Sequence, residues 1–377
     1  MTASMISTPL SLYVHVPWCI KKCPYCDFNS HKAEKNMDEN AYVDALIQDL
    51  DSQHASLSSR TINTVFIGGG TPSLLSGDAY HRLFQHIRTH YTLNDTAEIT
   101  LEANPGTVDY ERFKSYRDIG INRLSIGIQS FNDVHLKKLG RIHSANNAET
   151  AINSAKKAGF DNFNLDIMHG LPGQTVAEAL GDVRAALSFK PPHLSWYQLT
   201  LEPNTIFYKT KPTLPSEGVL ADIEEGGFRL LNKYQHYEIS AFSQANKHCR
   251  HNENYWTFGD YLGIGAGAHS KLTTETGITR FEKKRMPKDY IAAPCININQ
   301  REMGKDALPF EFMLMVSRLK RPIEKKLFEQ RTGQSISCIS NPLEEAGKLN
   351  LITENEHAIQ ITEHGFRFLN EFQGLFL

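Results

Sequence analysis

The stretch Cys19-Ile-Lys-Lys-Cys23-Pro-Tyr-Cys26 carries the strongest signal in this sequence, because it places three cysteines within eight residues at the spacing C-x3-C-x2-C. Thiolates are natural ligands of iron–sulfur clusters, and three of them on one loop can bind three irons of a [4Fe–4S] cube. The fourth iron would keep an open position for a substrate or cofactor. We therefore predict a [4Fe–4S] site held by Cys19, Cys23 and Cys26.

Zinc is the alternative metal for this loop, and it would need a fourth ligand such as His15 or His31, although neither has a familiar zinc-finger spacing. Six cysteines in 377 residues are too few for a disulfide scaffold. The remaining three, Cys249, Cys295 and Cys338, are scattered, and we expect them to be small buried hydrophobic residues.

Short apolar runs alternate with helical patterns along the first half of the chain. The expected strands are residues 12–16, 64–67, 98–101, 123–128, 163–168 and 194–199, and the expected helices are 39–52, 76–90, 109–119, 146–159 and 175–188. Strands that alternate with helices predict a parallel sheet with right-handed crossovers. The spacing of about 30–50 residues fits the βα units of a barrel or partial barrel. The predicted fold class is α/β.

The pattern loosens after residue 205. We expect a helix over 216–234, a strand over 236–242 and a Gly-rich strand over 262–268. The third part of the chain is predicted to hold helices at 309–319, 322–331 and 341–348, strands at 349–353 and 358–362, and a last helix at 363–373. Helices followed by a hairpin predict a small winged-helix-like domain.

Composition excludes several classes of protein. The chain has 40 Lys and Arg against 42 Asp and Glu, a formal charge of −2, which gives no general attraction to nucleic acid or to an acidic membrane. No apolar run approaches the ~20 residues of a membrane helix. The first 12 residues lack the pattern of a secretory signal. We expect a cytoplasmic protein.

Polar residues lie in or at the carboxyl ends of the expected strands. Gly68-Gly69-Gly70-Thr71-Pro72 follows the second strand, Glu102 ends the third, Gln129 ends the fourth and Asp166 lies within the fifth. Active sites of barrels gather at such ends, so these residues are expected to share one cavity. Each of them could instead cap a loop or a helix.

The cysteine spacing at the end of the first strand resembles the radical S-adenosylmethionine (SAM) superfamily. The segments LYVHVPWC, CPYCDFN, GGGTPS, LEANPG, GIQSF, LGRIH, DIMHGLPGQ and HNENYW are together similar to the heme chaperones of that superfamily, which are relatives of oxygen-independent coproporphyrinogen III oxidase. The resemblance runs from about residue 10 to the carboxyl terminus. It implies a partial (β/α)6 barrel in residues 1–240, extra strands and a heme-binding motif in 241–305, and a winged-helix-like domain in 306–377.

The resemblance also implies cofactor contacts. Its SAM-binding positions fall on Tyr13, Gly69, Gly70, Thr71, Glu102, Gln129, Arg141 and Asp166. Arg141 would meet the SAM carboxylate, because a fork of donors suits a bidentate anion. We expect Gly70→Val to exclude SAM sterically and to leave the cluster loop intact.

The segment His251-Asn252-Glu-Asn-Tyr255-Trp256 favours heme as a ligand. A neutral imidazole is a common axial ligand, and Tyr255 and Trp256 offer flat apolar surfaces. His251 is the first choice of ligand, while the alternatives are Cys249, His248 and, less strongly, His269. A purely structural role for His251 and Asn252 remains open.

Three functions compete at this point. The first is a heme chaperone that binds heme and transfers it to respiratory or other hemoproteins, using a [4Fe–4S] cluster and SAM. The second is the oxidase, an enzyme that converts coproporphyrinogen III to protoporphyrinogen IX. Its family has a further cysteine where this chain has Phe28 and a long segment before the first strand where this chain has about ten residues. Both departures favour the chaperone.

The third function is a winged-helix nucleic-acid binder with a redox cluster, and the near-neutral charge argues against it. We expect no nucleic-acid partner. A homodimer, and peripheral association with the cytoplasmic membrane through partners, are left open by the sequence.

Overall fold

Six parallel strands form the centre of one continuous sheet in this computed structural model, which describes residues 8–34 and 37–377. These strands are β1 (Leu10–Val16), β4 (Thr61–Gly69), β5 (Thr92–Ala103), β6 (Arg123–Gln129), β7 (Phe163–His169) and β8 (His193–Gln198). Each pairs in parallel with the next. The predicted α/β fold with six parallel βα strands is confirmed.

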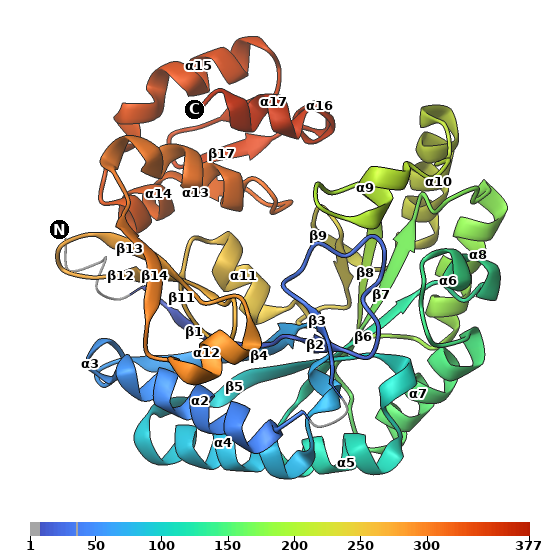
Figure 1. The fold of residues 1–377 in the computed structure, drawn as a ribbon. Helices are drawn as coiled ribbons and strands as arrows, with labels where there is room; N and C mark the ends of the chain where they lie inside the picture. Colours follow the sequence, from blue (N-terminus) through green and yellow to red (C-terminus); the bar gives the residue numbers. More distant parts are fainter. Residues whose placement is uncertain (1–7, 35–36) are drawn as a thin grey trace.

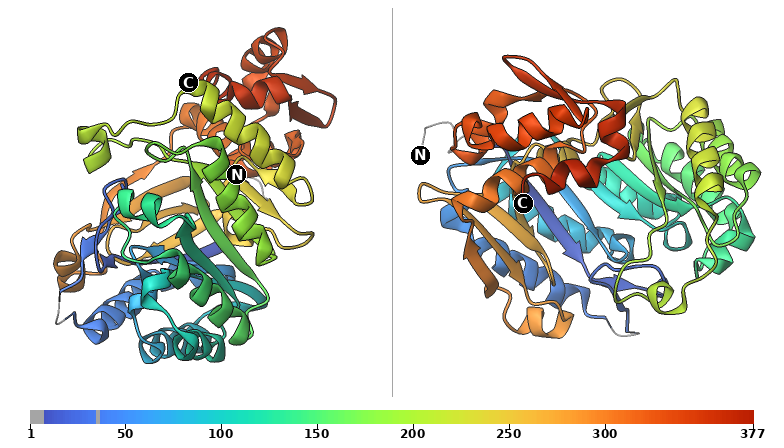
Figure 2. Two further views of the ribbon diagram at one scale, coloured as in Figure 1. Left: turned by 90° about the vertical axis from the view of Figure 1, so that its right-hand side faces the viewer. Right: turned by 90° about the horizontal axis from the view of Figure 1, so that it is seen from above.

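Helices cover the outer face of this curved sheet (Figures 1 and 2). They are α2 (Glu39–Ser52), α4 (Gly77–His90), α5 (Tyr110–Ile119), α7 (Ala145–Lys157) and α8 (Val176–Ser188). A side-chain oxygen caps the first turn of each helix, from Asp38, Ser76, Asp109, Ser144 and Thr175 respectively. Their apolar faces pack on the buried side chains of the strands, which leaves the carboxyl ends of the strands free to build a site.

Extra strands extend the sheet at both edges. On one side β11 (Asp260–Ile264) joins β1 in parallel, and antiparallel β12 (His269–Thr273), β13 (Ile278–Lys283) and β14 (Asn297–Glu302) follow. The predicted Gly-rich strand 262–268 is confirmed for residues 262–264, which belong to β11, and is wrong for the residues that follow. Gly265 and Gly267 have φ of +103° and +78°, so they form the turn between β11 and β12.

At the other edge lie β9 (Gln235–Glu238) and β10 (Ala241–Ser243), which are antiparallel to each other. The strand predicted over 236–242 is thus two strands. The chain turns between them because the Glu238 carboxylate accepts hydrogen bonds from the backbone N–H and hydroxyl of Ser240, both at 2.9 Å.

The carboxyl-terminal part has its own apolar core, and it packs above the sheet in Figure 1. Its elements are α13 (Leu308–Val316), β15 (Ile323–Glu324), α14 (Lys325–Thr332), α15 (Ser340–Lys348), β16 (Ile352–Glu354), β17 (Ala358–Ile361), α16 (Glu363–Arg367) and α17 (Leu369–Gly374). The helix predicted over 363–373 breaks at Phe368, whose ψ of 41° is not helical. The start of the helix predicted over 322–331 is taken by β15 instead.

Further helices and short strands connect these parts. They are β2 (Trp18–Cys19), β3 (His31–Lys32), α3 (His54–Leu57), α6 (Asp133–Lys138), α9 (Ile206–Thr210), α10 (Glu217–Leu230), α11 (Arg250–Trp256) and α12 (Pro287–Ala292). Within residues 8–34 and 37–377, no helix has the length and apolar character needed to cross a membrane. Residues 1–7, part of the segment predicted to lack a secretory signal, lie outside the described residues.

Candidate functional site

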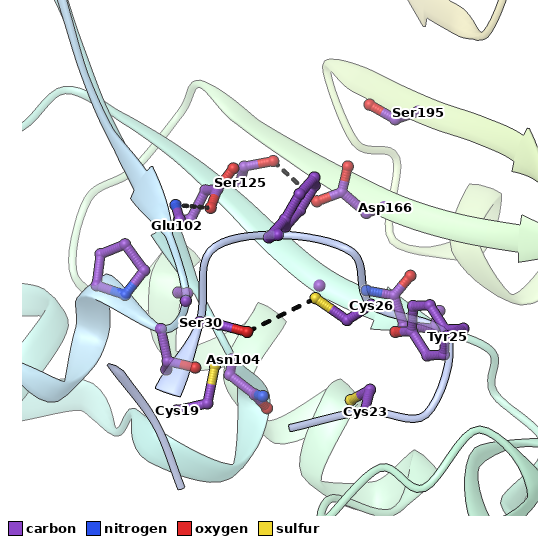
Figure 3. Close-up of a pocket in the computed structure, with 18 of the residues that line it drawn as sticks. Cys19, Cys23, Tyr25, Cys26, Ser30, Glu102, Asn104, Ser125, Asp166 and Ser195 are labelled. Atoms are coloured by element: carbon purple, nitrogen blue, oxygen red, sulfur yellow. Dashed lines mark hydrogen bonds between the residues drawn. The ribbon is translucent and has the colours of Figure 1, made fainter. Parts of the chain in front are cut away.

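The cysteine loop lies over the carboxyl ends of the central strands (Figure 3). It connects β2 to β3, which pair with each other in parallel. Backbone hydrogen bonds hold its two sides: Thr71 N–H donates to Trp18 O at 2.7 Å, and Phe207 N–H donates to Pro24 O at 3.0 Å. The loop is therefore fixed by the GGGTP turn on one side and by α9 on the other.

Cys19, Cys23 and Cys26 are half-buried and line one cavity of about 410 Å³, which we call the cysteine cavity. Among the described residues, no three His, Cys, Asp or Glu side chains converge on one ion position. A mononuclear zinc site needs such convergence, whereas each thiolate of a [4Fe–4S] cube binds a different iron. The donor set therefore fits the cube better than zinc.

The zinc alternative also lacks its fourth ligand. His15 accepts a hydrogen bond from Tyr13 OH at Nδ1 (3.0 Å) and donates from Nε2 to Asn29 O (2.8 Å), so both ring nitrogens are used. His31 Nε2 is shared between Asn29 Oδ1 and Arg285 O, both at 3.3 Å.

Two carboxylates face the cysteine cavity from adjacent regions of the sheet. Glu102 Oε2 accepts a hydrogen bond from Gly69 N–H at 3.1 Å, and Asp166 accepts hydrogen bonds from Ser125 Oγ (2.9 Å) and Asn164 Nδ2 (2.8 Å). Burial raises the pKa of Glu102 to about 8, with a further contribution from the charge of Asp166. The pKa of Asp166 is also raised, mainly by burial. A cation placed between the two carboxyl groups would favour their charged forms and so offset the cost of burying them.

Arg141 adds a cation to the same cavity. Its Nη2 donates to Gly127 O at 2.9 Å, and its Nη1 donates to Cys23 Sγ at 3.7 Å. Its Nε is buried and has no hydrogen-bond partner in the described part of the chain. An unsatisfied guanidinium N–H beside the cysteines suits the carboxylate of an amino acid moiety, so the residues present fit SAM as well as the cluster.

The remaining SAM-binding positions predicted from the sequence divide between two places. Gly69, Gly70, Thr71 and Gln129 line the cysteine cavity with Glu102, Arg141 and Asp166, whereas Tyr13 lies on the wall of a neighbouring cavity. Gln129 has φ of +69°, and its Oε1 accepts a hydrogen bond from Tyr197 OH at 3.0 Å.

The expectation that Gly70→Val would spare the cluster loop is wrong. A Cβ at Gly70 would lie 2.5 Å from Trp18 O, and Trp18 directly precedes Cys19. The close approach that Gly70 permits is to the backbone of the cysteine loop itself.

A second cavity of about 510 Å³, which we call the aromatic cavity, adjoins the first. Its wall carries six aromatic rings, those of Tyr13, Phe28, Phe66, Tyr255, Trp256 and Tyr261. Five residues line both cavities, namely Phe28, Gly69, Glu102, Asn252 and Trp256. The two cavities therefore share a wall.

His251 lies on α11 and lines the aromatic cavity, with its ring 5.0 Å from that of Phe66. Its Nδ1 is 2.9 Å from Thr64 Oγ1, and the Thr64 hydroxyl donates its proton to Ser11 Oγ at 2.8 Å. The Nδ1 atom must therefore carry the imidazole proton, which leaves a lone pair on Nε2. Burial lowers the pKa of His251 to about 3, so the ring is neutral at physiological pH. A neutral imidazole with a free Nε2 is a competent metal ligand.

The alternative ligands are placed less well. Cys249 is buried outside both cavities, its Sγ lies 3.8 Å from Glu98 Oε1, and burial raises its pKa to about 12. His248 stacks on Tyr237 at 3.9 Å between ring centroids and lines neither cavity. His269 lines the aromatic cavity but is exposed, 3.5 Å from Glu282.

Sequence reasoning missed several residues of both cavities. Ser125, Ser195 and Tyr197 line the cysteine cavity, while His15, Phe66, Tyr261 and Arg285 line the aromatic cavity. The alternation of side chains along β6 and β8 could have revealed the first group. The expectation that the scattered cysteines are buried holds for Cys249 and is wrong for Cys295 and Cys338, which are exposed.

Two family descriptions match parts of the chain. Residues 13–186 match the radical SAM superfamily, and residues 304–368 match the HemN C-terminal domain. The first range includes the cysteine loop, part of β1 and the whole of β4 to β7, and the second covers most of the carboxyl-terminal part.

Individual proteins match over nearly the whole length. The chain is 50% identical to the heme chaperone HemW of Haemophilus influenzae and 48% identical to HemW of Escherichia coli, covering 98% of both chains in each case. HemW of Bacillus subtilis is 34% identical, over 97% of this chain and 99% of that protein. The solved structure of coproporphyrinogen III oxidase (HemN) from Escherichia coli, a radical SAM enzyme, superimposes with a TM-score of 0.85 over 99% of this chain and 91% of that one. At 23% identity this last likeness shows the fold alone.

Proposed function

Because the chain belongs to the HemW family of heme chaperones, we propose that it binds heme in the aromatic cavity and transfers it to acceptor proteins. The observation that carries this proposal is the state of His251, a neutral imidazole whose Nε2 has no hydrogen-bond partner among the described residues and lies beside six aromatic side chains. A heme ligand site needs an axial donor and apolar faces that exclude water. The resemblance to HemW-type heme chaperones noted from the sequence supports the same function.

The cysteine cavity is proposed to hold a [4Fe–4S] cluster and SAM. Cys19, Cys23 and Cys26 would bind the cluster, which supplies one-electron chemistry and an open iron for SAM when bound. Arg141, through its unpartnered Nε, would orient the SAM carboxylate, and the carboxyl groups of Glu102 and Asp166 would face its cationic part. The shared wall would then keep SAM and heme next to each other.

Titration with heme tests the site. We expect His251→Ala to shift the Soret band and to weaken binding about tenfold or more, because the axial nitrogen is lost. His248→Ala is the matched control, since His248 lies three residues away and outside the aromatic cavity. An unchanged Soret band and affinity in His251→Ala, with the fold verified by circular dichroism, would contradict the proposed heme site.

The enzyme alternative is tested by complementation. A strain that lacks coproporphyrinogen III oxidase should not be rescued by this chain, whose position 28 is Phe and whose Phe28 side chain is exposed at the wall of both cavities. Rescue would overturn the chaperone as the sole function. The likeness to HemN bears on the fold and leaves this activity to the experiment.

The partners follow from the same proposal. Hemoproteins, including respiratory ones, are the proposed acceptors, in the cytoplasm or at its membrane. A nucleic-acid partner is disfavoured, because Arg321 and Lys325 in the carboxyl-terminal part pair with Glu253 (3.2 Å) and Glu354 (3.0 Å). The homodimer and the winged-helix-like character of this part remain predictions from the sequence.

A further inference from the structure

One charged residue at the aromatic cavity is not used by the heme site described so far. Arg285 follows β13 and lines the cavity together with His251. Its side chain is exposed and makes no ion pair or hydrogen bond with any described residue. The guanidinium is therefore available to an anion that enters the cavity.

The backbone of Arg285 is held in place although its side chain is free. Asn29 Nδ2 donates to Arg285 O at 2.9 Å and also to Ala266 O at 2.9 Å, while His31 Nε2 lies 3.3 Å from Arg285 O. Both donors belong to the end of the cysteine loop. A long-range contact thus fixes the backbone from which the Arg285 side chain extends at the edge of the cavity.

A row of contacts connects this edge to His251. The ring of His251 lies 6.5 Å from that of Tyr13, and Tyr13 OH donates to His15 at 3.0 Å. His15 in turn donates to Asn29 O at 2.8 Å, and Asn29 holds Arg285. One continuous wall therefore runs from the buried imidazole to the exposed guanidinium.

The charges along this wall are unequal. The rings of His15 and His251 are both buried, so this part of the wall is shielded from water. Among the described residues that line the cavity, Arg285 is the one with a permanent positive charge, and Asp27 and Glu102 are the acids. The buried part of the wall is mainly aromatic, and the cation lies at the exposed rim.

Resting on the proposed heme function, we infer that Arg285 binds a propionate carboxylate of heme, so that the anionic edge of the macrocycle faces outward and the apolar edge faces Phe66 and Trp256. A planar guanidinium can bind a carboxylate through two parallel hydrogen bonds. The same orientation would present the propionates to an incoming acceptor. Arg285 thus distinguishes heme from porphyrins whose carboxylates are blocked.

The test compares heme with iron protoporphyrin IX dimethyl ester, both in the same detergent buffer and with the full-length protein. Wild type should bind heme about fivefold more tightly than the diester, the range expected for an exposed charge pair. Arg285→Ala should weaken heme binding by about the same factor and leave diester binding unchanged. Arg285→Lys should restore part of the preference, because it keeps the charge and loses the fork.

Lys284→Ala is the matched control, because it removes the neighbouring positive charge, which does not line the cavity. Equal losses for Lys284→Ala and Arg285→Ala, or equal losses of heme and diester in Arg285→Ala, would overturn the assignment. The Soret band should stay unchanged in Arg285→Ala. Failure of the proposed heme site would be seen separately, as an unaltered Soret band in His251→Ala. The preference of the protein for heme over the diester would still decide the role of Arg285.

Discussion

The cysteine cavity and the aromatic cavity share a wall, yet they are built in different ways. The first is the more polar of the two and takes most of its residues from the cysteine loop and from β4 to β8. The second is mainly aromatic and adds residues of β1, α11, the β11–β12 turn and the segment after β13. Short sequence motifs predict the first cavity, whereas the second is formed by the order of the strands in the sheet. Substitutions can therefore change the proposed cluster and SAM site or the proposed heme site one at a time.

The largest effect that separates the two regions should come from the cysteine loop. Cys23→Ser should abolish the cluster, measured as a loss of about four irons and four sulfides per chain after anaerobic reconstitution. Heme affinity and the Soret band should change less than about twofold, because Cys23 lies outside the aromatic cavity. Cys338→Ser, at an exposed position, is the control. A full cube in Cys23→Ser would show that the ligand assignment is wrong.

The next effect concerns the glycine turn beneath the loop. Gly70→Ala should cost about 2–3 kcal/mol of stability and lower both cluster content and SAM affinity, because its Cβ would meet Trp18 O at 2.5 Å. Gly277→Ala makes the same change where no atom lies within 4 Å. Thermal unfolding, iron analysis and calorimetry with SAM measure the three quantities. Unaltered cluster content in Gly70→Ala would indicate that the two loops are independent after all.

The same contrast explains how far the sequence could predict the molecule. The six central strands, the three cysteines and the predicted SAM-binding residues of the cysteine cavity follow from local periodicity and short motifs, which short stretches of chain determine. The contact between Asn29 and Arg285 spans 256 residues and exists because β11 inserts beside β1. No local sequence pattern predicts that β11 pairs with β1. The turn at Gly265 and Gly267 and the break at Phe368 were missed because they depend on backbone angles.

The stability of the chain should depend on pH through Glu102, which lies in the wall shared by the two cavities. The pKa of Glu102 is raised from its ordinary value of 4.5 to about 8, chiefly by burial and then by Asp166. At pH values between about 5 and 8 the carboxyl group of Glu102 therefore binds a proton when the chain folds. The free energy of unfolding should fall as the pH rises from about 5 to 8. Glu102→Gln should stabilise the chain free of cluster and SAM by about 1–3 kcal/mol at pH 8 and by little at pH 5.

Urea unfolding at the two pH values measures this difference. Glu302→Gln on β14, where the side chain is exposed, is the control for the loss of one carboxylate. Equal stabilisation by Glu102→Gln at pH 5 and pH 8 would mean that the carboxyl group does not titrate in this range. The expected sign is the opposite of that for a salt-bridged carboxylate, whose stability is lost as the pH falls.

The smallest effect should come from Thr64, which is hydrogen-bonded to His251, and it should concern heme affinity alone. Thr64 accepts a hydrogen bond from His251 Nδ1 and donates to Ser11, which holds the imidazole proton away from Nε2. Thr64→Val keeps the shape and removes both hydrogen bonds, so we expect heme affinity to fall about fivefold. Thr64→Ser restores the hydroxyl and should recover most of the affinity. SAM affinity should not change, because Thr64 lines neither cavity. If Thr64→Val and Thr64→Ser lost affinity equally, the role of Thr64 would be packing, and the tautomer of His251 would not be set by this hydroxyl.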